Sequence, residues 1–275
     1  MYSANPKLVK QAQPILHISY DEAMELSHFG AKVLYPPTIV PVMRKGIPIH
    51  IKNTLDPEAE GSRIGVQKDG PSNPIKGISH ISDIAFRTHE GSGVVGITGT
   101  SKRLFETLST QGINVILITQ ASSEHSICIG VMQTDATQAK ESIDTEFAYE
   151  ISLGRLEPLL LENNLAIIAL VGEKMKSHQG ISGKMFRTLG QNNVNIRAIA
   201  QGASEKNISA VIAHKDVSKA LNSLHERFFE DQRKQLNLFI MGVGNVGGRL
   251  MAQIEQQHKY LSENFNLTIR VLGIS

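Results

Sequence analysis

The apolar and polar positions follow the same order twice in the middle of the chain. Residues 101–147 align without a gap with residues 182–228, at an offset of 81 positions, and 14 of the 47 aligned residues are identical. In each copy, apolar residues at helical spacing precede two short apolar runs with a polar turn between them, and a second helical pattern follows. We therefore interpret the two stretches as copies of one unit, and two copies are too few for a solenoid.

Each copy is expected to contain a strand, a helix, two strands and a second helix. The expected strands are Gly93–Ile97, Val115–Gln120 and Ser126–Met132 in the first copy, and Leu165–Val171, Ile196–Gln201 and Asn207–Ala213 in the second. The expected helices are Ser101–Gly112 and Ser182–Asn193, and a later pair that begins after Asp135 and Asp216, both good N-cap residues. This order is a ferredoxin-like arrangement that lacks only its last strand, so the predicted fold class is α+β.

The first 80 residues carry different signals. Ser19 and Glu22 have the spacing of a capping box, so a helix is expected to begin there and to end near Gly30. Alternating apolar residues predict a strand at Ile47–Ile51. Residues 54–80 are rich in Pro, Gly, Ser and acidic residues, which is typical of a linker, and a domain boundary is expected near residue 80.

The C-terminal part predicts a dinucleotide-binding motif. An expected strand, Gln235–Met241, runs into a G-x-G-x-x-G pattern, and an expected helix, Arg249–His258, precedes a strand at Leu267–Ile274. In such a motif the first glycine makes the turn, the second lets the pyrophosphate approach, and the third lets the helix pack closely. The candidate cofactor-binding residues are Gly242, Gly244, Asn245, Val246 and Gly247.

Composition disfavours several kinds of partner. Lysine and arginine total 28 against 26 acidic residues and are scattered, so no basic stripe indicates binding to nucleic acid or to an anionic membrane surface. No apolar run approaches the roughly 20 residues of a membrane span. The histidines and the single cysteine, Cys128, lack metal-ligand spacing, so no metal site is expected, and one cysteine suits a reducing cytoplasm.

RNA-recognition domains share this order of elements and are the binding alternative. They stack bases on aromatic residues of their central strands. The corresponding strands contain no aromatic residue here, and the chain has no tryptophan. RNA binding is therefore disfavoured.

Four carboxamide side chains recur at matching positions of the two copies. Asn114 and Gln120 correspond to Asn195 and Gln201. A carboxamide is neutral and both donates and accepts hydrogen bonds, which suits a small zwitterion with a hydroxyl group. A helix N-terminus after Gly99 and Thr100, or after Gly180 and Ile181, could receive a carboxylate. The alternative is that these side chains cap or bridge turns, and duplication also copies structural residues.

Residues 25–54, with the sequence ELSHFGAKVLYPPTIVPVMRKGIPIHIKNT, resemble the end of the catalytic domain of aspartate kinases. The resemblance implies that Lys32, with Val33 beside it, helps to hold ATP. Tyr35 stands where that family usually has a histidine, and the motif that opens these kinases is absent. We therefore assign no catalytic residue and expect that this chain alone does not phosphorylate a substrate.

The segments ITQASSEHSI and IAQGASEKNIS resemble the paired ACT domains of aspartate kinases. The resemblance implies that Gln120 and Gln201 bind an amino-acid effector. Threonine is the expected effector, although lysine-sensing relatives share the framework. In this family one ACT domain is commonly inserted within the other, which would account for a missing last strand. The resemblance also implies association of two or more chains through ACT sheets.

The C-terminal motif resembles the beginning of homoserine dehydrogenase, which implies a nicotinamide cofactor, NAD or NADP. Because only one β-α-β piece is present, weak or no cofactor binding is expected from this chain alone. The three resemblances occur in the order of the bifunctional aspartate kinase/homoserine dehydrogenases. That family transfers the γ-phosphate of ATP to the β-carboxylate of aspartate and reduces aspartate semialdehyde to homoserine.

We therefore interpret the chain as an internal piece of such an enzyme, in four parts. They are the kinase end and linker (1–80), a first ACT domain (81–163), a second ACT domain (164–234) and the beginning of a Rossmann domain (235–275). A free-standing, noncatalytic amino-acid sensor is the competing interpretation. A small oxidoreductase is disfavoured, because only one strand pair accompanies the glycine motif.

Overall fold

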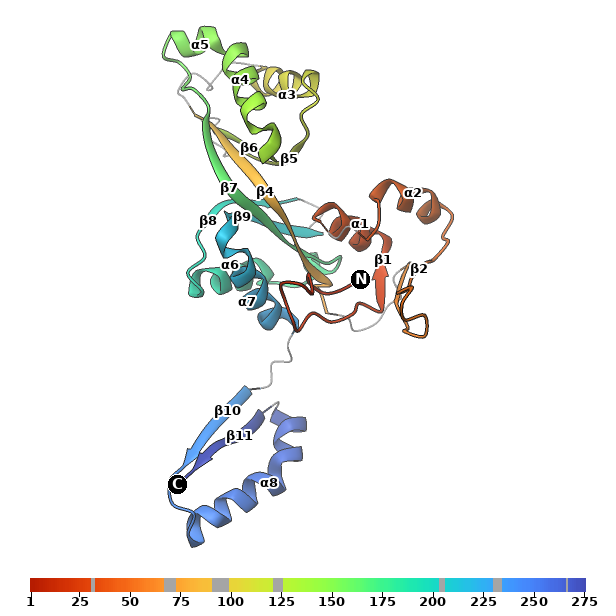
Figure 1. The fold of residues 1–275 in the computed structure, drawn as a ribbon, viewed down its shortest axis with the longest axis vertical. Helices are drawn as coiled ribbons and strands as arrows, with labels where there is room; N and C mark the ends of the chain where they lie inside the picture. The colour runs from red at the N-terminus through yellow and green to blue at the C-terminus, as the bar shows by residue number, and fades with distance from the viewer. Residues whose placement is uncertain are drawn as a thin grey trace. The chain divides into compact units, whose positions relative to one another are not determined.

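The chain forms two compact units in the computed structural model, residues 1–225 and 226–275 (Figure 1). The structure describes residues 1–30, 33–66, 73–90, 99–120, 126–202, 206–229, 234–265 and 267–275.

A six-stranded antiparallel sheet forms the centre of the first unit. Its strands lie in the order β5-β6-β4-β7-β9-β8. Their bounds are β4 (Gly77–Glu90), β5 (Val115–Gln120), β6 (Ser126–Met132), β7 (Leu160–Val171), β8 (Ile196–Gln201) and β9 (Asn207–Ala213). The two longest strands, β4 and β7, lie side by side in the middle of this sheet (Figure 1).

The duplication seen in the sequence is also present in the strand register. Ile84 pairs with Met132 in the first copy, and Leu165 pairs with Ala213 in the second, so both partners are shifted by 81 residues. The pairing of β5 with β6 and of β8 with β9 also repeats, including an irregularity after the first residue of each outer strand. The two copies are therefore equivalent in hydrogen-bond pattern as well as in sequence.

Each central strand contributes to both copies. The first part of β4, residues 77–81, pairs with residues 167–171 of β7 in the second copy, whereas residues 84–90 pair with β6 in the first. The first part of β7 pairs in turn with residues 84–88. The prediction that each copy lacks a last strand is wrong for the first copy, because residues 160–165 supply it. In the second copy residues 77–81 supply it, so the first domain is inserted within the second, as the resemblance implies. The strand expected at Gly93–Ile97 lies outside the described residues, and β4 takes the opening position in the first copy.

Paired helices cover one face of each copy. Helices α3 (Thr100–Thr110) and α4 (Ala136–Glu146) bury Leu104, Leu108 and Ile143 over the first copy, and the short α5 (Ala148–Ser152) follows. The second copy has α6 (Ile181–Gln191) and α7 (Val217–Phe229). Single 3-10 turns, η1 (Gln133–Asp135), η2 (Met175–Ser177) and η3 (His214–Asp216), connect elements. Asp135 precedes α4 as predicted, but its side chain does not cap the helix, because the 3-10 turn leaves this residue in a helical conformation.

The N-terminal residues pack on the opposite face of the sheet. They form α1 (Tyr20–His28), α2 (Pro36–Arg44) and a three-stranded sheet of β1 (His17–Ser19), β3 (Ser62–Gly65) and β2 (Ile49–Ile51). The predicted capping box of α1 is confirmed. Leu26 of α1 and Ile64 of β3 lie in one core cluster with Leu165 and Val171 of β7. The expected linker 54–80 therefore contains β3 and the beginning of β4, because Ile64 is an apolar residue of this core.

The second unit is a β-α-β motif. Strands β10 (Lys234–Ile240) and β11 (Leu267–Ile274) are parallel, and α8 (Asn245–Phe265) connects them. The helix begins earlier than predicted, within the glycine motif. Among the helices of the described residues, none is both long and apolar enough to cross a membrane.

Candidate effector site

The second copy places Gln201 beside the beginning of a helix. Gln201 is the last residue of β8 and is exposed, and its Oε1 accepts a hydrogen bond from Ser182 Oγ at 3.2 Å. Ser182 lies in the first turn of α6, whose N-cap is Gly180 with a left-handed φ of 83°. A glycine N-cap has no side-chain acceptor, so the first N–H groups of α6 remain available to an anion. The site thus combines a carboxamide, a hydroxyl and a helix N-terminus.

The first copy repeats the strand register and the glycine cap of this arrangement. Gln120 is exposed at the end of β5 and pairs with Ile127, as Gln201 pairs with Ile208. Helix α3 also begins after a left-handed glycine, Gly99, with a φ of 95°. Register and cap geometry therefore place Gln120 at the position equivalent to Gln201.

Asn114 and Asn195 lie at the other ends of the same strands. Both are exposed and immediately precede β5 and β8, whereas the glutamines end these strands. Six residues of extended chain cover about 20 Å, since each adds about 3.3 Å. The structure therefore does not bring the asparagine and the glutamine of one copy together around one small ligand.

Three side chains near the predicted site residues had not been assigned to a site. Ser182 contacts Gln201 directly, and the serine shared by positions 101 and 182 is the signal in the repeat that could have identified it. The second observation is an exposed isoleucine at Ile118 and at the equivalent Ile199. Both lie on strands at the edge of the strand order, where backbone groups can pair with another strand.

The predicted nucleotide-binding pair is described only in part. Lys32 lies outside the described residues, and Val33 is exposed. Helix α1 ends just before them, at Phe29 and a left-handed Gly30. A Cβ atom at Gly30 would lie 2.4 Å from the His80 carbonyl oxygen, so the chain is tightly held immediately before Lys32.

The predicted dinucleotide motif forms the expected turn between a strand and a helix. Gly242 has a φ of 90°, and a Cβ atom at Gly247 would lie 2.0 Å from the Gly242 carbonyl oxygen. A Cβ atom at Gly244 would contact nothing within 4 Å, and Val246 is exposed. Asn245 is the first residue of α8. These residues fit a pyrophosphate at the helix N-terminus, with Gly242 and Gly247 required for the turn itself.

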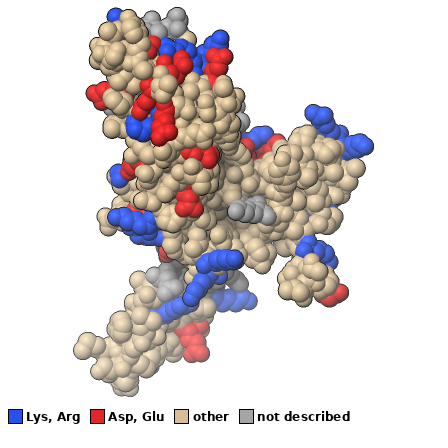
Figure 2. Space-filling view, turned by 45° about the horizontal axis from the view of Figure 1, so that its top comes forward, with Lys and Arg blue, Asp and Glu red and all other residues tan. Residues whose placement is uncertain are grey.

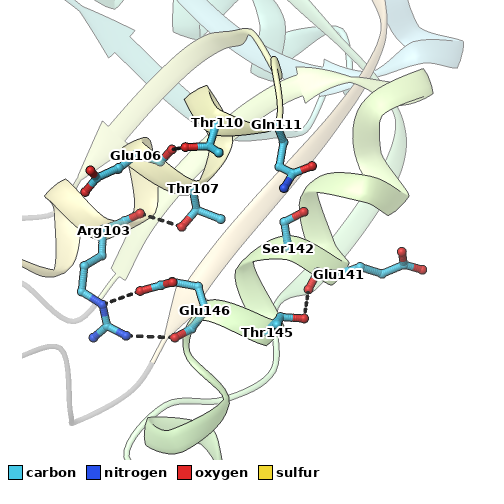
Figure 3. Close-up of a pocket in the computed structure, with 9 residues that line it drawn as sticks. All are labelled: Arg103, Glu106, Thr107, Thr110, Gln111, Glu141, Ser142, Thr145 and Glu146. Carbon is cyan, nitrogen blue, oxygen red and sulfur yellow. Dashed lines mark hydrogen bonds and ion pairs between the residues drawn. The ribbon is translucent and has the colours of Figure 1, made fainter.

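A groove between α3 and α4 is a separate feature (Figure 3). Its volume is about 550 Å³, and it is lined by Arg103, Glu106, Thr107, Thr110, Gln111, Glu141, Ser142, Thr145 and Glu146. Arg103 bonds Glu146 and Glu150 at 2.7 and 2.6 Å, which lowers the pKa of the Glu150 carboxyl group. No residue predicted to bind a ligand lines this groove.

Charged side chains of both signs mix over the surface seen in Figure 2. The formal net charge of the chain is only +2. Among the described residues, no group of three or more His, Cys, Asp or Glu side chains is arranged to hold a metal ion.

Comparison with known proteins identifies the class of fold. A model of the ACT domain matches residues 88–147 and 168–228, and a model of the amino acid kinase family matches residues 1–53. The chain therefore carries tandem ACT domains behind a segment that matches the amino acid kinase family.

The individual relatives are more specific. The bifunctional aspartokinase/homoserine dehydrogenase of Haemophilus influenzae is 42% identical over 275 residues, which is all of this chain and 34% of the relative. A chloroplastic bifunctional enzyme of Arabidopsis thaliana is 41% identical over the whole chain and 31% of its own length. The resemblance to bifunctional aspartate kinase/homoserine dehydrogenases is thereby confirmed along the whole chain. The chain spans about a third of the length of these relatives.

Solved structures agree with this relationship. The aspartate kinase of Clostridium acetobutylicum superposes with a TM-score of 0.75 at 29% identity, over 82% of this chain and 52% of that protein. The E. coli aspartokinase III in complex with lysine and aspartate, in its T-state, superposes with a TM-score of 0.69 at 27% identity, over 84% of this chain and 50% of that protein.

Proposed function

We propose that this chain is the regulatory region of a bifunctional aspartate kinase/homoserine dehydrogenase that binds threonine for feedback inhibition of aspartate-family amino-acid biosynthesis. One observation carries the proposal: Gln201 lies in hydrogen-bond contact with the first turn of α6, and Gln120 has the equivalent strand register in the first copy. The relatives over the whole chain support the assignment to this enzyme class.

The chemistry of the site suits a small hydroxylated amino acid. The carboxylate of threonine would meet the N–H groups at the helix N-terminus, and its ammonium and hydroxyl groups would exchange hydrogen bonds with the carboxamide and with Ser182. Threonine can inhibit only if it binds the inactive arrangement of the enzyme more tightly than the active one.

Lysine is the second candidate effector. It is supported by the E. coli aspartokinase III complex with lysine and aspartate. Calorimetric titration of the chain with threonine, lysine and methionine separates the candidates, because each is tested under the same conditions. Heat from threonine is expected, and heat from lysine alone would overturn the choice of threonine.

In the complete enzyme, the flanking parts would serve the two reactions. Lys32 and Val33 would contribute to the ATP site of the kinase, and the Gly242 to Gly247 turn would bind the pyrophosphate of NAD or NADP. Kinase sequence upstream and dehydrogenase sequence downstream in the coding frame would support this proposal. Start and stop signals at the two ends would favour a free-standing sensor instead.

The proposal includes a homo-oligomer in the cytoplasm, formed through the ACT sheets. Ile118 and Ile199 expose apolar surface on β5 and β8, the two outer strands of the strand order. Sedimentation of the chain, alone and with Ile118→Lys, tests this part. A larger species that becomes smaller in the variant is expected.

A further inference from the structure

Side chains on one face of helix α1 form polar contacts with the second ACT domain. Asp21 Oδ2 lies 2.7 Å from Lys206 Nζ, and Glu25 Oε2 accepts a hydrogen bond from Asn207 Nδ2 at 2.7 Å. Asp21 and Glu25 are one helical turn apart, so they reach neighbouring residues at the beginning of β9 together. The bond to Asp21 also raises the pKa of Lys206, which stays charged.

The carboxylate of Glu22 makes the most enclosed of these contacts. Its side chain is buried, with only 2% of the residue exposed. One oxygen, Oε2, accepts a hydrogen bond from Ser19 N at 3.1 Å and completes the capping box of α1. The other oxygen, Oε1, accepts a hydrogen bond from Glu173 N at 3.0 Å, directly after β7. A buried carboxylate that loses a hydrogen-bond donor is destabilised by its desolvation. Loss of either the Ser19 or the Glu173 contact therefore destabilises the buried Glu22 side chain.

The other end of α1 is fixed to the sheet as well. Ser79 Oγ of β4 donates a hydrogen bond to the Phe29 carbonyl oxygen at 2.7 Å. Gly30 lies so close to the His80 carbonyl oxygen that no side chain fits there. The helix therefore connects the loop after β7 at its beginning with β4 at its end, and Lys32 follows two residues later in the sequence.

We infer that α1 transmits effector binding from the second ACT domain to the kinase segment, with Glu22 as the positioning residue. The inference rests on the proposed function and names its coupling element. Glu173 begins the segment that leads to α6, whose first turn holds Ser182 and its bond to Gln201. A ligand that orders this segment strengthens the Glu173–Glu22 bond, and a stronger bond restrains α1 up to Gly30. By linkage, a change in α1 alters effector affinity in return.

Hydrogen–deuterium exchange on the full chain tests the inference, with calorimetry on the same samples. Glu22→Gln keeps the volume of the side chain but leaves one acceptor oxygen for two N–H donors. Glu58→Gln is the matched control, because Glu58 is exposed. Threonine is expected to slow exchange of the α1 amides on the order of tenfold in the wild-type chain and in Glu58→Gln, and by less than about threefold in Glu22→Gln.

The results distinguish the coupling role of α1 from the proposed function of the chain. Threonine that releases heat without slowing α1 exchange in the wild-type chain overturns the coupling role, and the proposed function stands. The same follows if Glu22→Gln shows the full wild-type slowing. Absence of heat in the wild-type chain removes the proposed function and this inference together.

Discussion

Asp83 and Asn164, which are 81 residues apart, both have a left-handed backbone conformation, with φ values of 59° and 57°. Asp83 lies in β4 and Asn164 in β7, each between the part of the strand that pairs in one ACT domain and the part that pairs in the other. Such a conformation costs a residue with a side chain about 1–2 kcal/mol. Its presence at equivalent positions shows that the crossover between the domains imposes the same backbone bend on both strands.

Substitution of Asn164 tests this bend. Asn164→Val is expected to lower the free energy of unfolding by about 1–3 kcal/mol, because a β-branched residue strongly disfavours this conformation. Asn164→Gly, the matched control, adopts it freely and should stay within about 1 kcal/mol of the wild type. Urea denaturation followed by circular dichroism provides the measurement. Equal stability of the two variants would show that the bend carries no strain.

Gly172 provides a test of the packing between β7 and the chain before β4. A Cβ atom there would lie 1.9 Å from the Pro74 carbonyl oxygen, and the nearby Lys76 N donates to the Val171 carbonyl oxygen at 2.8 Å. Gly172→Ala should therefore destabilise the chain by about 1–3 kcal/mol, as overpacking does. Gly190→Ala, in α6 with nothing within 4 Å, should be neutral or stabilising by up to about 1 kcal/mol. The denaturation midpoint should fall in Gly172→Ala and should stay the same or rise in Gly190→Ala, and an equal fall in both variants contradicts this packing.

His225 makes stability depend on pH. Burial lowers the pKa of its imidazole, and its Nε2 lies 2.9 Å from Ser3 Oγ. The unfolded chain therefore binds a proton more readily than the folded one, so stability falls as the pH drops through the ordinary histidine value of about 6.5. His225→Gln should reduce this loss between pH 7.5 and 5.5, measured by urea denaturation at both values. Burial also lowers the pKa of His80, which adds a loss of the same sign that the variant retains.

The repeat made much of the fold predictable, because its strands are short apolar runs that lie between clear turn signals. The strands at Val115–Gln120 and Asn207–Ala213 have the predicted bounds. The strand that completes the second domain was missed, because residues 77–81 pair with residues 167–171, far away in the sequence. The Ser182–Gln201 contact was missed for a similar reason, since it depends on how α6 lies over the sheet.

Calorimetric titration of threonine into Gln201→Ala, Gln120→Ala and the control Gln191→Ala tests the central claim most directly. Each loss of a site glutamine is expected to weaken binding about tenfold or more, because a hydrogen bond to a charged group contributes about 1.5–3 kcal/mol. The control lies at the exposed end of α6 and should bind as the wild type does. Unchanged threonine affinity in both site variants would contradict the claim that these glutamines hold the effector.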